Sequence, residues 1–277
     1  MVAASSALTI EWKTPADAID SSTVYDAMRT AGGHVDELRK IGDADTEFNQ
    51  SRMPLSATYR TPYQTHSSIG PSCGVADIKR DSAVVWSATQ GSFPLRDAIA
   101  ELIGLPKDKV RVIWTEGAGC YGQNGADDAS AEAAIVSQTI GRPVRVQWMR
   151  HDEHGWDPKG PAEGNVGPNG KIRSWSYLIS TPTHISRPMG SAGNLLPGRM
   201  MGIPPKPVRI GGDHCARTLY HLPNERVAVR WLPDGALRPS SMRGLGAVPN
   251  TFLPMSRSST TWPISRIATR SISGLRI

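Results

Sequence analysis

The segment GAGCYGQNG, residues 117–125, carries the residue types that can hold an anionic cofactor. Its glycines Gly117, Gly119 and Gly122 spell GxGxxG between a predicted strand and a predicted helix. Small residues let the backbone approach an anion closely, and amides at a helix N-terminus donate hydrogen bonds to it. We therefore expect a site for a negatively charged cofactor here, with a purely structural turn as the alternative.

A nicotinamide dinucleotide fits this segment less well. Folds that bind it place an acidic residue about 20 positions after the glycines to hold the ribose, whereas the strand that follows here ends at Arg150, before Asp152. Asp127 and Asp128 also lie in the first turn of the next helix, where they stabilise its dipole and would repel a diphosphate. The residues favour another ligand, and the dinucleotide stays a minor alternative.

The elements that must position this segment follow from hydrophobic periodicity. A strand from Val110 to Glu116 leads into it, and a helix over 126–141, which Gly141 ends, follows it. Proline and glycine predict irregular chain at 158–170 and 194–212, either as solvated loops or as segments that wrap over a site. Further strands are predicted at 55–63, 73–79, 83–89, 143–149, 172–181 and 226–232, and further helices around 22–29, at 95–103 and from Arg150. The pattern predicts an α+β fold with mixed strands and a few helices.

Composition predicts a soluble globular chain. The 277 residues, 39% of them hydrophobic, suffice for one large domain or two medium ones. No run approaches the roughly 20 apolar residues that span a bilayer, and the opening lacks an export signal, so we expect a cytoplasmic location as the sequence stands. Cys73, Cys120 and Cys215 match no zinc or iron-sulfur spacing and are predicted to be buried or half-buried thiols.

The positive charge is concentrated in the last residues. The net charge is +6, and residues 253–277 hold four arginines and no acidic residue, which leaves +2 (6 − 4) for the remainder. A basic nucleic-acid binder is therefore a weak alternative, and we expect no nucleic-acid partner.

The succession of motifs around the glycine segment resembles a known family. The sequence is similar, from about Ala7 to Phe252, to the molybdopterin-binding large subunit of the xanthine dehydrogenase and aldehyde oxidase family, nearest to its isoquinoline 1-oxidoreductase and nicotinate dehydrogenase branch. The motifs that carry the resemblance are YRTPYQTHSSIGPSCGVADIK, VVWSATQGSFPLRDAIAELIGLPKDKVRV, EGAGCYGQNGADDASAEAAIVSQTIGRPVRVQWMRHDEHGWDPKGP and LRPSSMRGLGAVPN.

The resemblance implies a molybdopterin cofactor whose dithiolene holds the molybdenum, so that no protein side chain ligates the metal. It further implies hydroxylation of an N-heterocycle or aldehyde with water-derived oxygen. Electrons would pass to iron-sulfur clusters on a small [2Fe-2S] partner subunit and, in this branch, to a cytochrome c. Complete relatives are in some cases exported to the periplasm.

Site residues carry over from the resemblance one at a time. Gln64 matches a glutamine that hydrogen-bonds a molybdenum oxygen, with an ordinary strand-end amide as the alternative. Gly119, Tyr121 and Gly122 match a Gly-Phe-Gly turn over the metal, with tyrosine for phenylalanine and Cys120 inserted, and Gly117 opens the same cofactor-binding segment.

Arg243, in SMRGLG, matches an arginine at the substrate pocket, with a solvated surface arginine as the alternative. His66 and Gln90 lie beside these motifs and are weaker candidates. The zinc-like pair His151 and His154 is predicted to mark a helix start and not a metal site. Asn124 and Gly125 stand where purine-oxidising relatives have an acidic residue, so purine specificity is not expected.

The resemblance also predicts what the chain lacks. The family's glutamate base lies near the C-terminal end of the subunit and has no counterpart here, so we expect no catalytic residue in this chain and negligible hydroxylase activity from it alone. We divide the chain into a lead-in at 1–52, a partial molybdopterin-binding domain at 53–252 and an aberrant, frameshift-like, disordered tail at 253–277. The alternative is a truncated, non-catalytic gene product that retains only part of the fold.

Overall fold

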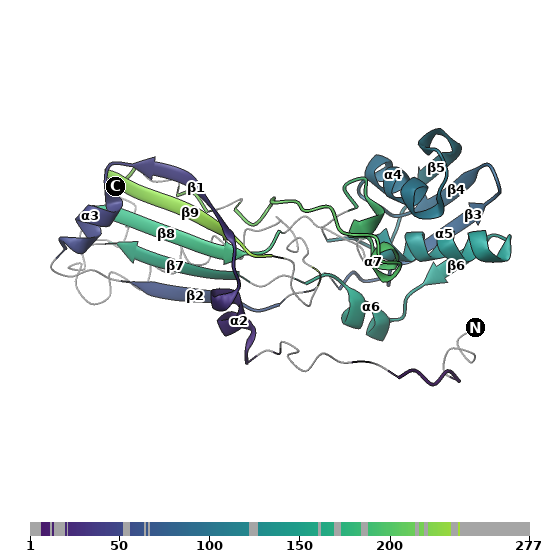
Figure 1. The fold of residues 1–277 in the computed structure, drawn as a ribbon, viewed down its shortest axis with the longest axis horizontal. Coiled ribbons are helices and arrows are strands. Elements are labelled where there is room, and N and C mark those ends of the chain that lie inside the picture. Colours follow the sequence, from purple (N-terminus) through teal and green to yellow (C-terminus); the bar gives the residue numbers. More distant parts are fainter. Residues whose placement is uncertain are drawn as a thin grey trace.

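The chain folds into two lobes, which lie at opposite ends of an elongated molecule in Figure 1. We call them the sheet lobe, which contains a five-stranded sheet, and the helical lobe, in which helices cover a four-stranded sheet. The computed structural model describes residues 7–11, 13, 20, 22–51, 56–63, 65, 67–121, 127–159, 162–168, 173–183, 188–213, 216–218, 221–233 and 238.

The sheet of the helical lobe has the strand order β5-β4-β3-β6. β3 runs antiparallel to β4 and to β6, whereas β4 and β5 are parallel because α4 connects them as a crossover. The bounds are β3 (Cys73–Ile78), β4 (Ala83–Ser87), α4 (Ser92–Ile103), β5 (Val110–Trp114), α5 (Asp128–Ile140) and β6 (Val144–Gln147). A short 3-10 turn, η1 (Lys107–Lys109), precedes β5.

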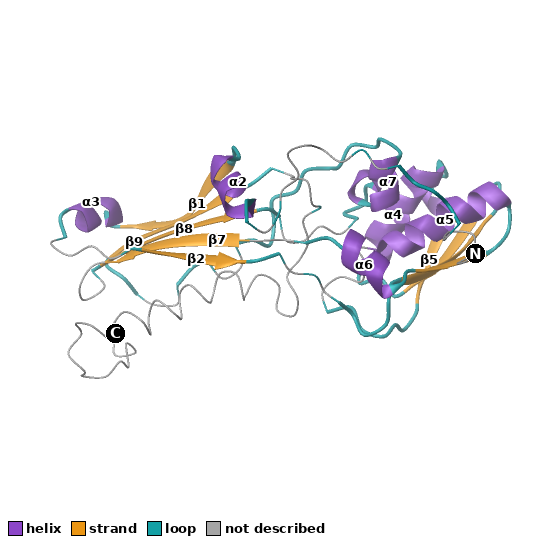
Figure 2. Cartoon of the chain, turned by 90° about the horizontal axis from the view of Figure 1, so that it is seen from below, coloured by secondary structure: helices purple, strands orange, loops and turns teal. Residues whose placement is uncertain are grey.

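Helices α4 and α5 lie on one face of this sheet (Figure 2) and close the core of the lobe. Leu95 and Ile99 of α4 are fully buried against Val85 of β4 and the alanines of α5. The alanine-rich face of α5 allows close packing, and a Cβ at Gly74 of β3 would stand 2.5 Å from the Cα of Ser130. A glycine in β3 and small residues in α5 are therefore both needed for the helix to lie directly on the strand.

Helices α4 and α5 both end at the glycine that the sequence predicts as the end of the helix. Gly104 and Gly141 adopt left-handed φ angles of +72° and +67° and donate backbone hydrogen bonds to carbonyls of the preceding turn. An L side chain is strained in this conformation, so glycine terminates the helix at low cost.

The sheet lobe has the strand order β1-β9-β8-β7-β2, with β8 and β9 parallel and the other neighbours antiparallel. Tyr177 and Ile179 of β8 and Val227 and Val229 of β9 form its buried centre. The bounds are α2 (Val24–Thr30), β1 (His34–Ile41), α3 (Ala44–Asn49), β2 (Ala57–Thr61), β7 (Ala162–Pro168), β8 (Ser174–Thr181) and β9 (Asn224–Trp231).

Buried carboxylates join the segments of the sheet lobe. Glu163 of β7 accepts hydrogen bonds from Nε and Nη2 of Arg29 on α2, at 3.1 and 2.9 Å, and from Nε of Arg60 on β2, at 3.1 Å. Arg39 of β1 forms an ion pair of 2.8 Å with the fully buried Glu225 of β9. Each of these two buried charges therefore has an arginine partner from a different segment.

Three short elements lie along the connections of the helical lobe. They are α6 (Arg150–Trp156), η3 (Ala192–Asn194) and α7 (Leu196–Met200). The last two follow β8 yet pack on α4 and α5, and the backbone amide of Ala192 donates a 2.7 Å hydrogen bond to Glu101 of α4. The chain thus crosses between the lobes more than once. None of the helices in the described ranges is long and apolar enough to cross a bilayer.

The α+β prediction is confirmed, as are the strands predicted around β2, β3, β4, β5, β6, β8 and β9 and the helices predicted around α2, α4, α5 and α6. The sequence missed β1, α3, β7 and α7, the last of which lies in the predicted irregular chain at 194–212. The prediction of irregular chain at 158–170 was wrong over β7, where Gly164 leaves room for the Tyr177 ring of β8: a Cβ there would lie 2.9 Å from it. The predicted disorder of 253–277 falls outside the described residues.

Candidate cofactor-binding site

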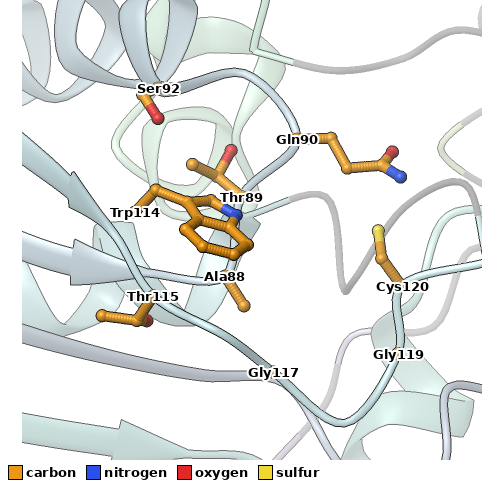
Figure 3. Close-up of a pocket in the computed structure, with 9 residues that line it drawn as sticks. All are labelled: Ala88, Thr89, Gln90, Ser92, Trp114, Thr115, Gly117, Gly119 and Cys120. Atoms are coloured by element: carbon orange, nitrogen blue, oxygen red, sulfur yellow. The ribbon is translucent and has the colours of Figure 1, made fainter.

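A cavity of about 460 Å³ opens at the carboxyl ends of the parallel strands β4 and β5. This edge of a parallel pair is where open α/β sheets bind ligands, because the connecting loops diverge there. The residues that line the cavity are shown in Figure 3: Ala88, Thr89, Gln90, Ser92, Trp114, Thr115, Gly117, Gly119 and Cys120.

The glycines of the β5 wall are required by close approach. A Cβ at Gly117 would lie 2.6 Å from the Cβ of Ala88 in the opposite wall, and Gly119 has a φ of +90°. The amide of Gly119 donates a 2.8 Å hydrogen bond to the carbonyl of Gly117, and Gly70 donates one of 3.3 Å to Ala118. The turn that the sequence singled out is therefore held in a conformation that larger residues at 117 and 119 would disturb.

Thr89 links the two walls. Its hydroxyl accepts a 3.0 Å hydrogen bond from the amide of Gly91, just before α4, and donates one of 2.9 Å to the carboxylate of Asp127. Asp127 precedes α5 and has a φ of +67°. The start of α5 is thus bonded to the loop that follows β4.

Among the described residues, the side chains that line the cavity are uncharged. Figure 3 shows the amide of Gln90 and the thiol of Cys120 pointing toward the same space, and Trp114, 59% exposed, adds a flat indole. The hydroxyls of Thr89, Ser92 and Thr115 complete a polar but neutral lining. Such a lining can hydrogen-bond an anionic or heterocyclic group without a carboxylate to repel it.

The carboxylates that the sequence placed at the start of α5 do not face the ligand unpaired. Asp127 is bonded to Thr89, and Asp128 is fully buried, where Arg238 and the backbone amide of Leu196 bind it. Burial raises the pKa of the Asp128 carboxyl, and the Arg238 guanidinium opposes that rise. Arg238 compensates the charge of Asp128, whereas a neutral hydroxyl leaves the Asp127 carboxylate negatively charged, so the predicted repulsion of a diphosphate rests on Asp127.

Several predicted site residues have an observed place. Gly117 and Gly119 line the cavity, and the Tyr121 ring lies against Gly119, about 3.1 Å from where a Cβ would be. Tyr121 has a φ of +52° and is 39% exposed. Gln64, His66, Gly122 and Arg243 lie outside the described residues.

Gln90, which the sequence placed among the weaker candidates, lines the cavity. The signal that could have promoted it is its position directly after β4, the parallel neighbour of β5. The predicted helix start at Arg150 is confirmed, since α6 begins there. His151 is exposed beside Asp152, and the described ranges contain no group of three or more side chains suited to a metal ion.

The residues that line this cavity lie in a segment that matches a known protein family. Residues 28–162 match the family described as molybdopterin cofactor-binding domain. The chain is 34% identical over 251 residues to a subunit of nicotinate dehydrogenase from Pseudomonas putida, and the match covers 88% of this chain but 21% of that protein. The chain therefore spans about a fifth of the length of this relative.

Two solved structures share the fold. The aldehyde oxidoreductase from Desulfovibrio gigas matches with a TM-score of 0.63 and 19% identity, covering 90% of this chain and 26% of that one. The aldehyde oxidoreductase from Desulfovibrio desulfuricans matches with a TM-score of 0.65 and 16% identity, covering 83% and 24%.

The cavity fits the cofactor that the family binds. Its volume lies within the range of small-molecule sites, roughly 300–1,000 Å³, and Gly117 and Gly119 line it with backbone and no side chain. The neutral amide and hydroxyl groups suit the polar edge of a pterin, and the Trp114 indole suits its flat ring. With fold, cavity and sequence in agreement, the chain is a large-subunit region of the xanthine dehydrogenase family and carries its molybdopterin cofactor-binding domain.

Proposed function

We propose that this chain forms one wall of the molybdopterin site of a molybdenum hydroxylase that, as a complete enzyme, oxidises an N-heterocycle or an aldehyde. The observation that carries the proposal is the neutral, glycine-walled cavity at the ends of β4 and β5, within the segment that matches the cofactor-binding family. The names of the relatives, nicotinate dehydrogenase and aldehyde oxidoreductase, support these two substrate classes.

The residues of the cavity bind and orient the cofactor. The Gln90 amide carries both a donor and an acceptor, and Gly117 and Gly119 present backbone without a side chain to the cavity. When bound, the cofactor supplies the two-electron oxidation of the substrate carbon. Gln64, Tyr121 and Gly122 remain proposed cofactor contacts, and Arg243 remains a proposed substrate-pocket residue that would hold an anionic or carbonyl group.

The rest of the machinery is proposed to lie elsewhere. The catalytic glutamate base and the second wall of the cofactor site would come from the remainder of the large subunit. A small [2Fe-2S] subunit would take the electrons and pass them to a cytochrome c. We therefore expect the 277-residue chain, taken alone, to bind cofactor weakly and to turn over substrate negligibly.

Molybdenum content tests the proposal directly. The chain would be produced in a host that makes the molybdenum cofactor, and molybdenum per chain would be measured by plasma mass spectrometry after purification. We expect substoichiometric but reproducible molybdenum that falls several-fold in Gln90→Ala. The matched control is Gln147→Ala, on β6 and outside the cavity, which should retain the parental molybdenum content.

A folded chain without molybdenum, or equal content in Gln90→Ala and the parent, would contradict the proposal. The first of these results would favour the alternative function, a non-catalytic protein that retains part of the fold. Thermal unfolding of all three proteins shows whether a lost metal reflects a lost fold.

A further inference from the structure

Asp128 and Arg238 form a buried ion pair between distant segments. Nη1 of Arg238 donates a 2.8 Å hydrogen bond to Oδ1 of Asp128, and Nη2 binds Oδ2. The Asp128 side chain is 0% exposed and that of Arg238 is 7% exposed. Asp128 begins α5 in the helical lobe, whereas Arg238 follows β9 of the sheet lobe. The pair therefore connects the two lobes.

Other segments meet at the same pair. The Nη2 of Arg238 donates a 3.2 Å hydrogen bond to the carbonyl of Trp156 at the end of α6, and the Arg238 carbonyl accepts one of 2.8 Å from the amide of Lys159. Oδ1 of Asp128 also accepts a 2.7 Å hydrogen bond from the amide of Leu196, where α7 begins. The buried carboxylate of Asp128 therefore connects α5 directly to the start of α7 and, through Arg238, to the end of α6.

This junction lies next to the cavity along the chain. Asp127, the residue before Asp128, is the partner of Thr89 in the cavity wall. The two consecutive aspartates at the start of α5 therefore have different partners. Asp127 binds the loop after β4, and Asp128 binds the chain that leaves the sheet lobe.

We infer that Arg238 is a positioning residue for the cofactor cavity: by binding Asp128 it holds the start of α5 in place, and with it Asp127, the partner of Thr89 in the cavity wall. This inference rests on the proposed function of the cavity. A guanidinium binds both carboxylate oxygens in a fixed plane, which a lysine cannot do.

Two cysteines of the chain provide a local probe. Cys120 in the cavity and Cys73 in β3 of the same lobe, outside the cavity, both carry thiols that are not in a disulfide. The rate at which iodoacetamide alkylates each one can be followed in the full chain by mass spectrometry of tryptic peptides. Local movement of the glycine-rich segment changes the Cys120 rate alone, whereas opening of the whole lobe changes both rates.

The variant to compare with the parent is Asp128→Asn with Arg238→Gln. It removes both charges together, so that no unpaired charge is left buried, and the asparagine still accepts from Leu196. We expect the ratio of the Cys120 rate to the Cys73 rate to rise about fivefold. Arg238→Lys, which keeps the charge but not the fork, should give an intermediate ratio.

The matched control is the ion pair in the sheet lobe between the half-buried Arg39 and the fully buried Glu225, neither of which lines the cavity. Arg39→Gln with Glu225→Gln should lower the thermal midpoint and leave the ratio unchanged. A parental ratio in the Asp128 and Arg238 variant, or equal rises at both cysteines, would show that the pair serves stability alone and would overturn the inference. If that variant does not fold, an unchanged ratio in Arg238→Lys overturns it instead. The labelling needs no cofactor, so a parent without molybdenum would count against the proposed function only.

Discussion

The hydroxyl of Thr89 donates a 2.9 Å hydrogen bond to the carboxylate of Asp127, and this bond ties the loop after β4 to the start of α5. The two residues belong to opposite sides of the glycine-rich segment, yet the same hydroxyl also accepts from the amide of Gly91. Through these two bonds the Thr89 hydroxyl contacts both Gly91, which precedes α4, and Asp127, which precedes α5.

Thr89→Val removes this hydroxyl and nearly preserves the volume. It leaves the half-buried carboxylate of Asp127 and the amide of Gly91 without that partner, so we expect the free energy of unfolding to fall by about 1–2 kcal/mol. Urea denaturation followed by circular dichroism measures the change. Thr139→Val is the control, because that hydroxyl binds the carbonyl of Ile135 on an exposed helix face, and we expect a much smaller effect. Equal losses in the two variants would contradict the linking role of Thr89.

Gly117→Ala tests the close approach of the cavity walls. The added Cβ would lie 2.6 Å from the Cβ of Ala88, so one wall must move, at a cost of about 1–3 kcal/mol. We expect a lower thermal midpoint together with a lower molybdenum content. Gly155→Ala on α6 meets no atom within 4 Å and should instead stabilise the fold slightly. If Gly117→Ala matches the parent in both measurements, the walls are not in contact as described.

The stability of the helical lobe should depend on pH through Glu132. Burial raises the pKa of this half-buried carboxyl from 4.5 to about 6, against the opposing hydrogen bond from the Trp148 indole. Between these pH values the folded protein keeps a proton that the unfolded chain has lost, so the free energy of unfolding falls as the pH rises. The penalty is complete above pH 6 and amounts to about 2 kcal/mol.

Glu132→Gln removes that titration and still offers Trp148 an acceptor. The variant should therefore match the parent near pH 4.5 and exceed it in stability near pH 7. Urea midpoints for both proteins across this range measure the difference. A difference that does not change with pH would rule out Glu132 as its source.

Glu163→Gln should destabilise the sheet lobe. The buried carboxylate pairs with Arg29 and Arg60, so its neutralisation removes both charge-assisted contacts and leaves Arg29 with Asp26 alone, at a cost of about 1.5–3 kcal/mol. Asp26→Asn is the matched control, because Asp26 pairs with the same Arg29 but is 78% exposed. We expect that control to be nearly neutral. Comparable losses in both variants, measured by urea unfolding, would argue against a special role for the buried carboxylate.

The sequence predicted the helical lobe better than the sheet lobe, for a physical reason. In β4, α4, β5 and α5 the apolar period, the strand and helix lengths and the terminal glycines all indicate the same elements. β1 (HVDELRKI) lies at the edge of its sheet and is stabilised in part by the pair Arg39–Glu225, so its polar sequence has no apolar alternation to detect. β7 contains the residue types of a loop, because its Gly164 makes space for Tyr177.

The same limit applies to the site. Gly117 and Gly119 were found because close approach and left-handed backbone angles require glycine. Gln90 was only a weak candidate in the sequence. It lines the cavity because β4 pairs in parallel with β5, and no local sequence pattern encodes that pairing. The role of Arg238 depends on a contact with Asp128, 110 residues away in sequence, and only the tertiary structure brings those residues together.

The order of strands in the sheet lobe has a consequence for biosynthesis. Among the described strands, β1 has β9 as its neighbour, but β1 ends at Ile41 and β9 begins at Asn224. The ribosome must therefore add the 182 residues that lie between them (224 − 41 − 1) before β9 begins, which takes roughly 10–40 s at cellular elongation rates. During that interval the nascent β1 has no partner for its backbone, while the helical lobe already has all its strands. The emerging polypeptide thus presents an unsatisfied strand edge, the kind of segment that chaperones shield until translation reaches Trp231.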